Sequence, residues 1–288
     1  MNNSTGNADA NKKTRSIGIM QGRLVPRYQK RYQAFPIGYW HAEFHTAREI
    51  GLNAIEFILD HNDVEKNPLM TDVGIAEIKK VCKESGTQVH SVCADYFMQA
   101  PFQSEHQHQS EEVLKILIQQ SADLGVKDIV IPCVDVSSLK TLDDKARLLK
   151  SLEKCIPLAE QKGIFLNLET DLAPQEFKNL LTSFGSRTIK VNYDIGNSAS
   201  LGYHPEEEFA AYGDYISDLH VKDRKLGTGS VPLGAGDAKL ELVFKLLGQL
   251  KFKGNICMQA ARAEHFVDDL PLVKKQYDMT REWVRKYL

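Results

Sequence analysis

Short runs of consecutive apolar residues alternate along the chain with longer segments that have helical spacing. Continuous apolar runs are typical of strands that are buried on both faces, as in parallel sheets, whereas half-exposed strands alternate polar and apolar residues. The runs predict eight strands, at residues 16–21, 53–57, 88–93, 128–132, 164–169, 189–194, 216–221 and 255–259.

The segments between these strands carry apolar residues at helical intervals. The clearest predicted helices are residues 111–124, 145–161, 240–250 and 267–288. Gly51, Gly86, Gly125 and Gly163 each come shortly before a predicted strand. A glycine can end a helix there because it adopts the left-handed conformation at little steric cost. Strands and helices therefore alternate through the whole chain, which predicts an α/β fold.

This alternation predicts a single (β/α)8 TIM barrel, a fold that takes about 250 residues. We expect the barrel to occupy residues 16–288 as one catalytic domain, after a disordered tail at residues 1–15. An open doubly wound sheet is the alternative. It would need a glycine-rich phosphate-binding turn after its first strand, and the segment Gln21-Gly22-Arg23-Leu24 has no such pattern.

Composition excludes several classes of protein. The chain has 36 Lys and Arg against 38 Asp and Glu, a net charge of −2, and 42% hydrophobic residues. It is too apolar for a disordered protein, and it lacks the basic excess of a protein that binds nucleic-acid phosphates. No apolar run approaches the roughly 20 residues that cross a bilayer. We therefore expect neither a nucleic acid nor a membrane as a partner.

Cysteine usage and the N-terminus predict the compartment. The five cysteines are an odd number, include no CxxC pair and lie in apolar segments, which is typical of reduced thiols. Residues 1–13 are polar and have no apolar core of a signal peptide. These features predict a cytoplasmic protein. The sequence leaves open whether copies of the chain assemble into a homo-oligomer.

Polar residues gather where the apolar runs stop, which is where TIM barrels carry their catalytic groups. Glu169, Asp194, His220 and Gln259 end four consecutive predicted strands. Neighbouring strands lie about 4.8 Å apart, so these side chains can converge on one point. Two carboxylates, an imidazole and an amide oxygen suit a divalent cation such as Mg²⁺, Mn²⁺, Co²⁺ or Zn²⁺. The sequence therefore predicts a metal site made of these four residues.

Several motifs resemble the xylose-isomerase-like TIM-barrel family, which contains sugar isomerases and epimerases and also endonuclease IV. The resemblance covers nearly all of residues 16–287 and is strongest at 17–24, 166–170, 193–197, 220–224 and 232–237. It implies that Glu169, Asp194 and His220 bind the metal. The ketose 3-epimerases of the family have a second Glu at the position of Gln259, and their two Glu act as acid/base partners on opposite faces of the sugar.

The amide at Gln259 shapes the predicted chemistry. Glu169 can take a proton next to a carbonyl group, and the metal can stabilise the enediolate. Inversion of a carbon needs a second acid, which an amide cannot be, whereas an aldose–ketose isomerisation needs only one base. His90 or Glu56 remains a candidate for a second proton donor, so epimerisation also stays open. The endonuclease activity is disfavoured because Asn197 stands where a further His would be expected.

We therefore expect a divalent-metal-dependent isomerase or epimerase of a small sugar or sugar phosphate that works through an enediolate. The alternatives are a metal-dependent dehydratase or lyase of a keto-sugar or cyclitol, or a barrel that binds a sugar without turnover. Arginines after strands are candidates for binding a phosphate or carboxylate. The residues expected to catalyse are Glu169 and His90, and those expected to contact the carbohydrate are Gln21, Arg23, Glu56, Asn197, Arg224 and Arg262.

Overall fold

Eight parallel strands form a closed barrel in the computed structural model, which describes residues 15–263 and 268–288. Around the barrel the strand order is β1-β10-β7-β6-β5-β4-β3-β2. The strands are β1 (Gly18–Met20), β2 (Ala54–Ile58), β3 (Gln88–Cys93), β4 (Asp128–Cys133), β5 (Phe165–Thr170), β6 (Ile189–Asp194), β7 (Ile216–Val221) and β10 (Asn255–Met258). The predicted (β/α)8 barrel is confirmed, and each predicted strand overlaps one strand of the barrel.

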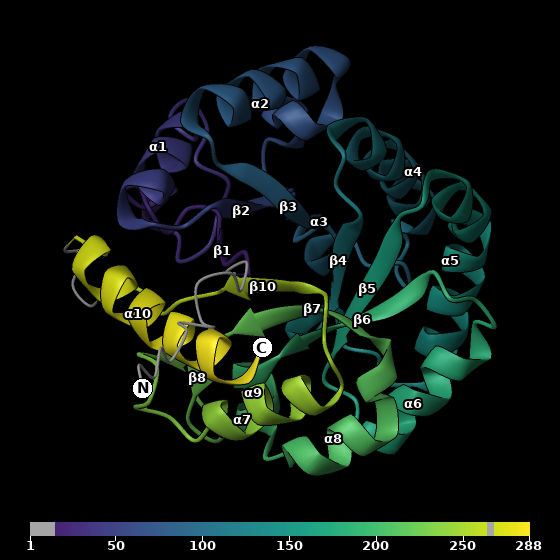
Figure 1. Cartoon of the computed structure of the whole chain (residues 1–288). Helices are drawn as coiled ribbons and strands as arrows, with labels where there is room; N and C mark the ends of the chain where they lie inside the picture. The colour runs from purple at the N-terminus through teal and green to yellow at the C-terminus, as the bar shows by residue number, and fades with distance from the viewer. Residues whose placement is uncertain (1–14, 264–267) are drawn as a thin grey trace, which may run out of the picture.

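Helices surround the strands on the outside of the barrel (Figure 1). They are α1 (His41–Ile50), α2 (Asp72–Ser85), α3 (Tyr96–Gln99), α4 (Gln107–Leu124), α5 (Leu142–Lys162), α6 (Pro174–Ser183), α7 (Ile195–Leu201), α8 (Pro205–Tyr212), α9 (Leu240–Gln249) and α10 (Leu270–Tyr287). Gly51, Gly86, Gly125 and Gly163 follow α1, α2, α4 and α5 in the left-handed conformation, as predicted. No helix in the described part of the chain is long and apolar enough to span a membrane.

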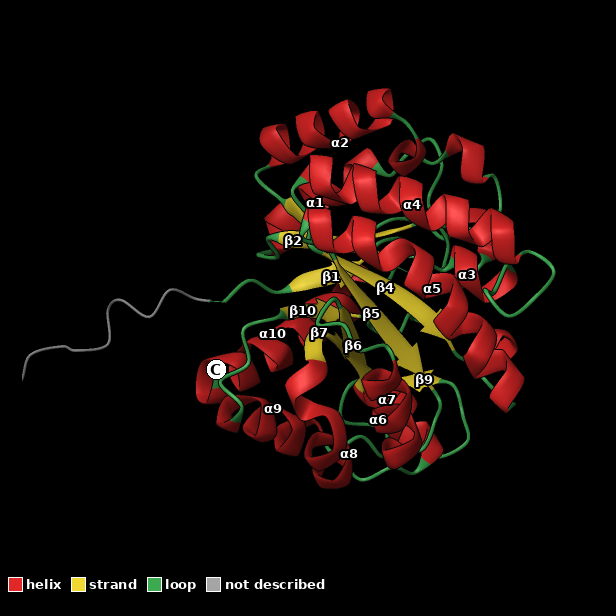
Figure 2. Ribbon diagram, turned by 90° about the vertical axis from the view of Figure 1, so that its right-hand side faces the viewer, coloured by secondary structure: helices red, strands yellow, loops and turns green. Residues whose placement is uncertain are grey.

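Short elements decorate the connections between strands and helices. The 3-10 helices are η1 (Tyr28–Lys30), η2 (Val64–Lys66), η3 (Pro68–Met70), η4 (Asp135–Ser137) and η5 (Gly213–Tyr215). After β7 the chain forms a two-stranded antiparallel sheet of β8 (Asp223–Arg224) and β9 (Ser230–Val231). Figure 2 shows β9 beyond the arrowheads of β5 and β6, so this sheet adds to the end of the barrel where those strands stop.

The core has two parts. The larger part lies between strands and helices and includes Phe44, Phe57, Leu117 and Val243, all without exposed surface. The smaller part is a group of buried apolar side chains on five barrel strands: Met20, Ile58, Cys93, Val130 and Cys257. Because successive residues of a strand point to opposite faces, the residues two positions apart along a strand stack in layers within a barrel. This layering decides which polar side chains share the barrel end.

The first described residue is already part of the folded structure. Arg15 donates hydrogen bonds to the carbonyl oxygens of Phe252 and Gly254, at 2.7 and 2.5 Å. Its guanidinium also lies 5.2 Å from the centre of the Phe252 ring. The rest of the tail predicted at residues 1–15, and the start of the helix predicted at 267, lie outside the described residues.

Candidate active site

Three of the predicted ligands meet at the end of neighbouring strands. Glu169 lies near the end of β5, Asp194 ends β6, and His220 on β7 pairs with Asp194 in the strand register. One ligand atom from each residue lies within 4.8 Å of the other two. The Nδ1 atom of His220 is 3.5 Å from Oε2 of Glu169 and 3.8 Å from Oδ2 of Asp194. This trio of Glu169, Asp194 and His220 offers two carboxylates and an imidazole nitrogen to one point.

Asparagines hold the Glu169 carboxylate in place. Asn192 donates to its Oε2 at 2.7 Å, and Asn197 donates to its Oε1 at 2.6 Å. Asn192 lies two residues before Asp194 on β6, so both side chains point into the barrel. Asp194 in turn accepts the backbone N–H of Asn197 at 2.8 Å, which begins α7 directly after the strand.

Electrostatic interactions give the carboxyl groups of Glu169 and Asp194 different pKa values. Burial and the neighbouring charge of Asp194 raise the pKa of Glu169 to about 7. Burial also opposes ionisation of Asp194, but Lys222 and His220 outweigh it and hold its pKa at about 2. The Nζ atom of Lys222 lies 3.2 Å from Oδ2 of Asp194. Asp194 therefore stays ionised at neutral pH, whereas Glu169 can gain or lose a proton near neutral pH.

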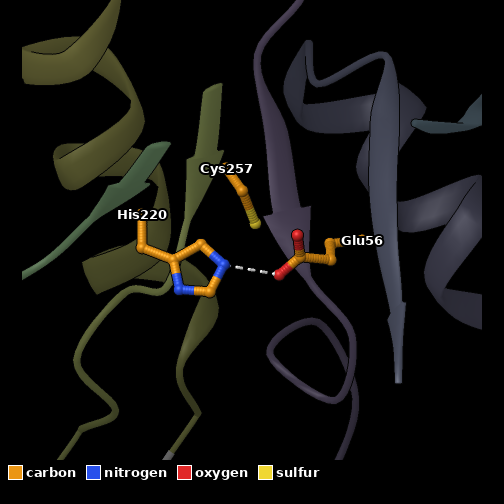
Figure 3. A group of neighbouring side chains, drawn as sticks. All are labelled: Glu56, His220 and Cys257. Carbon is orange, nitrogen blue, oxygen red and sulfur yellow. Dashed lines mark hydrogen bonds and ion pairs between the residues drawn. The ribbon is translucent and has the colours of Figure 1, made fainter. Parts of the chain in front are cut away.

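A second cluster lies behind the trio and shares His220. Figure 3 shows Glu56, His220 and Cys257 pointing toward one another from three strands. Burial, together with the nearby charge of Glu56, raises the pKa of the Cys257 thiol well above its usual value. A protonated thiol is a poor ligand because metals bind the thiolate. Of the two groups, the trio therefore offers the better set of ligand atoms for a cation, and the contact between Glu56 and His220 orients the imidazole ring.

A cavity of about 450 Å³ opens above the trio and is lined by Glu169 and Gln259. Loops after several strands supply the rest of the wall, with Arg23, Tyr32, Gln33, Cys93, Asp95, Met98, Pro132, Val134, Asp135, Asn197, Lys222, Arg224, Gly229 and Ser230. This volume and this polar wall suit a small, hydroxyl-rich molecule. We call this cavity the active-site pocket.

Gln259 presents an unused oxygen at this pocket. Its side chain is 8% exposed, and its Oε1 has no hydrogen-bond partner among the described residues. Its Nε2 makes one long contact of 3.5 Å, to Oε1 of Gln33. A buried carbonyl oxygen without a donor is costly. A cation or a substrate hydroxyl in the pocket would relieve that cost, so the site fits a metal held by the trio with Gln259 beside it.

The three predicted arginines differ in their surroundings. Arg23 lines the pocket, but its N–H groups already donate to Oε1 of Gln33 and to the backbone oxygens of Ala260 and Tyr32. Arg262 is not among the pocket-lining residues and pairs with Asp269 at 2.7 Å.

Arg224 keeps donors at the pocket mouth. It lines the pocket, where its Nη1 donates to Asn197 at 2.7 Å and its Nε to the backbone oxygen of Thr228 at 2.7 Å. Of the three predicted arginines, Arg224 is best placed to meet an anionic substrate.

Three other predicted site residues lie away from the pocket lining. Gln21 accepts the backbone N–H of Ile58 at 3.0 Å, and Glu56 accepts the Ser91 hydroxyl at 2.6 Å. The ring of His90 lies against Gly18, one layer deeper in the barrel. Asn197, by contrast, lines the pocket as expected.

Sequence reasoning did not select Gln33, Asp95, Asn192 or Lys222. Asn192 could have been found, because it stands two positions before Asp194 on the same face of a strand. Asp95 follows β3 as directly as the selected residues follow their strands. Gln33 comes from the long loop at residues 22–38, whose length suggests a lid over the barrel end or a subunit contact, but no local pattern singles out Gln33.

Comparison with known proteins agrees with the fold. Residues 44–286 match the family model of the xylose isomerase-like TIM barrel, so the chain belongs to this family, as the resemblance implied. A 2-epi-5-epi-valiolone 7-phosphate 2-epimerase from Actinoplanes sp. is 25% identical and is matched over 76% of this chain and 77% of its own length. The Escherichia coli protein SgbU, assigned as an L-ribulose-5-phosphate 3-epimerase, is 23% identical over 76% of this chain and 83% of its own.

A solved structure shows the same fold at lower identity. The xylose isomerase domain protein from Planctomyces limnophilus superposes with a TM-score of 0.75 at 14% identity, over 94% of this chain and 98% of that chain. At this identity the likeness supports the barrel architecture and carries no statement about substrate.

Proposed function

We propose that this protein is a divalent-metal-dependent isomerase or epimerase of a small sugar or sugar phosphate, acting by proton transfer through an enediolate. The observation that carries the proposal is the trio of Glu169, Asp194 and His220, whose ligand atoms lie within 4.8 Å of one another beneath the pocket. The enzyme class, a sugar isomerase or epimerase, is shared with the two sequence relatives.

The trio and the Oε1 atom of Gln259 are the groups that would hold the cation. This set of oxygens with one imidazole nitrogen is compatible with Mn²⁺, Mg²⁺, Co²⁺ or Zn²⁺. A cation bound there supplies Lewis acidity, which polarises a substrate carbonyl group and stabilises the negative charge of an enediolate.

Glu169 is the base of the proposed reaction. Its pKa of about 7 suits a group that takes and returns a proton near neutral pH. Asn192 and Asn197 fix both carboxylate oxygens, so the group does not have to reorganise when it approaches the substrate carbon. Lys222 keeps Asp194 ionised and so prevents Asp194 from taking the proton instead.

The pocket wall supports a substrate with an anionic end. Arg224 lies at the mouth beside Gly229 and Ser230, which offer backbone and hydroxyl groups. Arginine and hydroxyl groups are common partners of phosphate oxygens. We therefore propose that the preferred substrate is a sugar phosphate and that a neutral sugar is the second candidate. The five cysteines are buried and form no disulfide bond, which supports a cytoplasmic location.

Deuterium wash-in tests the proposal. The protein is incubated in D₂O with a panel of ketoses and ketose phosphates and with Mn²⁺, Mg²⁺ or Co²⁺, and the recovered sugars are analysed by mass spectrometry. We expect deuterium next to the carbonyl group of at least one sugar and no loss of water. Glu169→Gln should abolish this exchange, whereas Glu207→Gln, on the exposed side of α8, should not.

Two results would contradict the proposal. Loss of water from the substrate would favour the dehydratase or lyase alternative. A metal-loaded protein that exchanges no proton on any sugar would favour a barrel that only binds its ligand.

A further inference from the structure

Asp95 reaches the wall of the active-site pocket from a different strand end than the trio does. It follows β3, which is opposite β7, the strand of His220, and two strands from β5, the strand of Glu169. Asp95 and Glu169 both line the pocket, so a sugar in the pocket can contact both carboxyl groups. No role for Asp95 follows from the metal-site pattern, because it lies outside the four strand ends that form that pattern.

Neutral groups orient the carboxyl group of Asp95, whereas an ion pair holds the nearby carboxyl group of Asp60. Its Oδ2 accepts the side-chain N–H of Gln33 at 2.6 Å, and its Oδ1 lies 3.3 Å from the Cys93 thiol. By contrast, Asp60 on the neighbouring strand end forms a bidentate pair with Arg31. Asp95 is therefore oriented by neutral donors and not by a cation.

Asp95 is also disposed to carry a proton. Burial raises the pKa of Asp95 above its usual range, and the nearby carboxylates of Asp60 and Glu56 raise it further, while the hydrogen bonds from Gln33 and Cys93 oppose this rise. A raised carboxyl pKa is typical of general acids that work near neutral pH.

Gln33 links Asp95 to the position where a second carboxylate is absent. Its Nε2 donates to Asp95, and its Oε1 accepts hydrogen bonds from Arg23 at 2.9 Å and from Gln259 at 3.5 Å. The amide of Gln259 and the carboxyl of Asp95 thus belong to one hydrogen-bonded group on the pocket wall. A second carboxyl group is therefore present on the pocket wall, although Gln259, directly after β10, is an amide.

We propose that Asp95 is the second catalytic acid/base and that it makes the enzyme an epimerase despite the amide at Gln259. This inference rests on the proposed function. Glu169 removes the proton from the carbon next to the carbonyl group, and the C–H electron pair forms the enediolate. Asp95 then gives its carboxyl proton to the opposite face of that carbon, which forms the new C–H bond and leaves Asp95 as a carboxylate. Proton exchange with water returns both groups to their starting states.

The exchange pattern of two variants tests the assignment. For one epimer the reacting proton faces Glu169, and for the other it faces Asp95. Asp95→Asn should reduce formation of the second epimer by at least about 100-fold, in the range of general acid catalysis. The same variant should keep deuterium exchange of the first epimer within about threefold of the wild type and lose exchange of the second. Glu169→Gln, which also removes a ligand of the trio, should abolish the exchange of both epimers.

Matched controls separate this role from a structural one. Asp171→Asn changes a strand-end carboxylate that accepts the Ser138 hydroxyl and is not among the pocket-lining residues, so it should keep both activities. Divalent metal affinity of Asp95→Asn, measured by calorimetry with Mn²⁺, should stay within about threefold of the wild type and so report an intact barrel end. Asp95→Ala should give the same exchange pattern, which attributes the effect to loss of the carboxyl group and not to the introduced amide.

The outcomes distinguish the two proposals. If Asp95→Asn and Asp95→Ala form the product, whether it is the second epimer or an aldose, at close to the wild-type rate, Asp95 is not the second acid. The proposed function still stands in that case. If the metal-loaded wild type exchanges no proton on any sugar, the proposed function is overturned and this assignment with it.

Discussion

The Nε2 atom of His220 lies 2.8 Å from Oε1 of Glu56, and both side chains are without exposed surface. Nε2 of His220 therefore faces the Glu56 carboxylate, and its Nδ1 faces Glu169 and Asp194 and lies 3.0 Å from the amide nitrogen of Asn192. A carboxylate behind a metal-binding histidine fixes the tautomer and the ring orientation, and it makes the free nitrogen more basic.

Replacing Glu56 by Gln should weaken metal binding without removing a ligand. The amide can still contact Nε2, but it carries no charge to polarise the ring. Such outer partners typically contribute 10–100-fold in metal affinity, so we expect a loss of about that size for Mn²⁺. Isothermal titration calorimetry measures it, with the exposed Glu77→Gln as a control. An affinity within twofold of the wild type would show that Glu56 does not orient the ligand.

The amide at Gln259 sets the charge of the site. Gln259→Glu adds a carboxylate to the pocket wall that Glu169 also lines, which would attract a divalent cation more strongly. We expect Mn²⁺ affinity to rise by about tenfold or more, since tenfold corresponds to about 1.4 kcal/mol. Gln175→Glu, which adds the same charge on the exposed side of α6, should leave the affinity unchanged. Unchanged affinity in Gln259→Glu would place the Gln259 side chain outside the coordination sphere.

The barrel and its trio could be predicted because both depend on local periodicity. Parallel strands bring their carboxyl ends to one side, so Glu169, Asp194 and His220 follow from strand ends alone. The orientation of His90 and the engagement of Arg23 depend on non-local contacts instead. His90 lies deeper in the barrel because it is three residues from the end of β3, and the β2–β3 pairing also shifts its register next to Glu56.

Backbone carbonyls and loop positions explain the remaining differences. The residue type of Arg262 suggests anion binding, but Asp269 and the Val25 carbonyl take its donors in the fold. Gln33 reaches the pocket only because residues 22–38 cross the barrel end. Such contacts join residues far apart in the sequence, and no spacing rule indicates them.

Glu43 should make stability depend on pH. Burial raises its pKa from 4.5 to about 7, although the backbone N–H groups of Gly22 and Leu24 donate to it. A folded-state pKa above the unfolded one contributes stability that is fully present below pH 4.5 and is lost as pH rises through about 7. The shift corresponds to at most about 3 kcal/mol.

Urea unfolding at several pH values checks this contribution. Between pH 5 and 8 the free energy of unfolding of Glu43→Gln should fall less than that of the wild type, because the amide does not titrate. Glu49→Gln, on the exposed side of the same helix, should follow the wild type. Parallel pH curves for all three proteins would mean that Glu43 is ionised in the fold.

Gly18 makes room for the His90 ring inside the barrel. A Cβ atom at Gly18 would lie 2.3 Å from Cε1 of His90, far inside van der Waals contact. Gly18→Ala should therefore destabilise the fold by about 1–3 kcal/mol through overpacking. His90→Ala removes the clashing ring, so the double variant should be more stable than the sum of the two single effects predicts, with a coupling of at least about 1 kcal/mol. Urea unfolding of the wild type and the three variants measures it. Additive effects within about 0.5 kcal/mol would show that the ring does not contact Gly18 in solution.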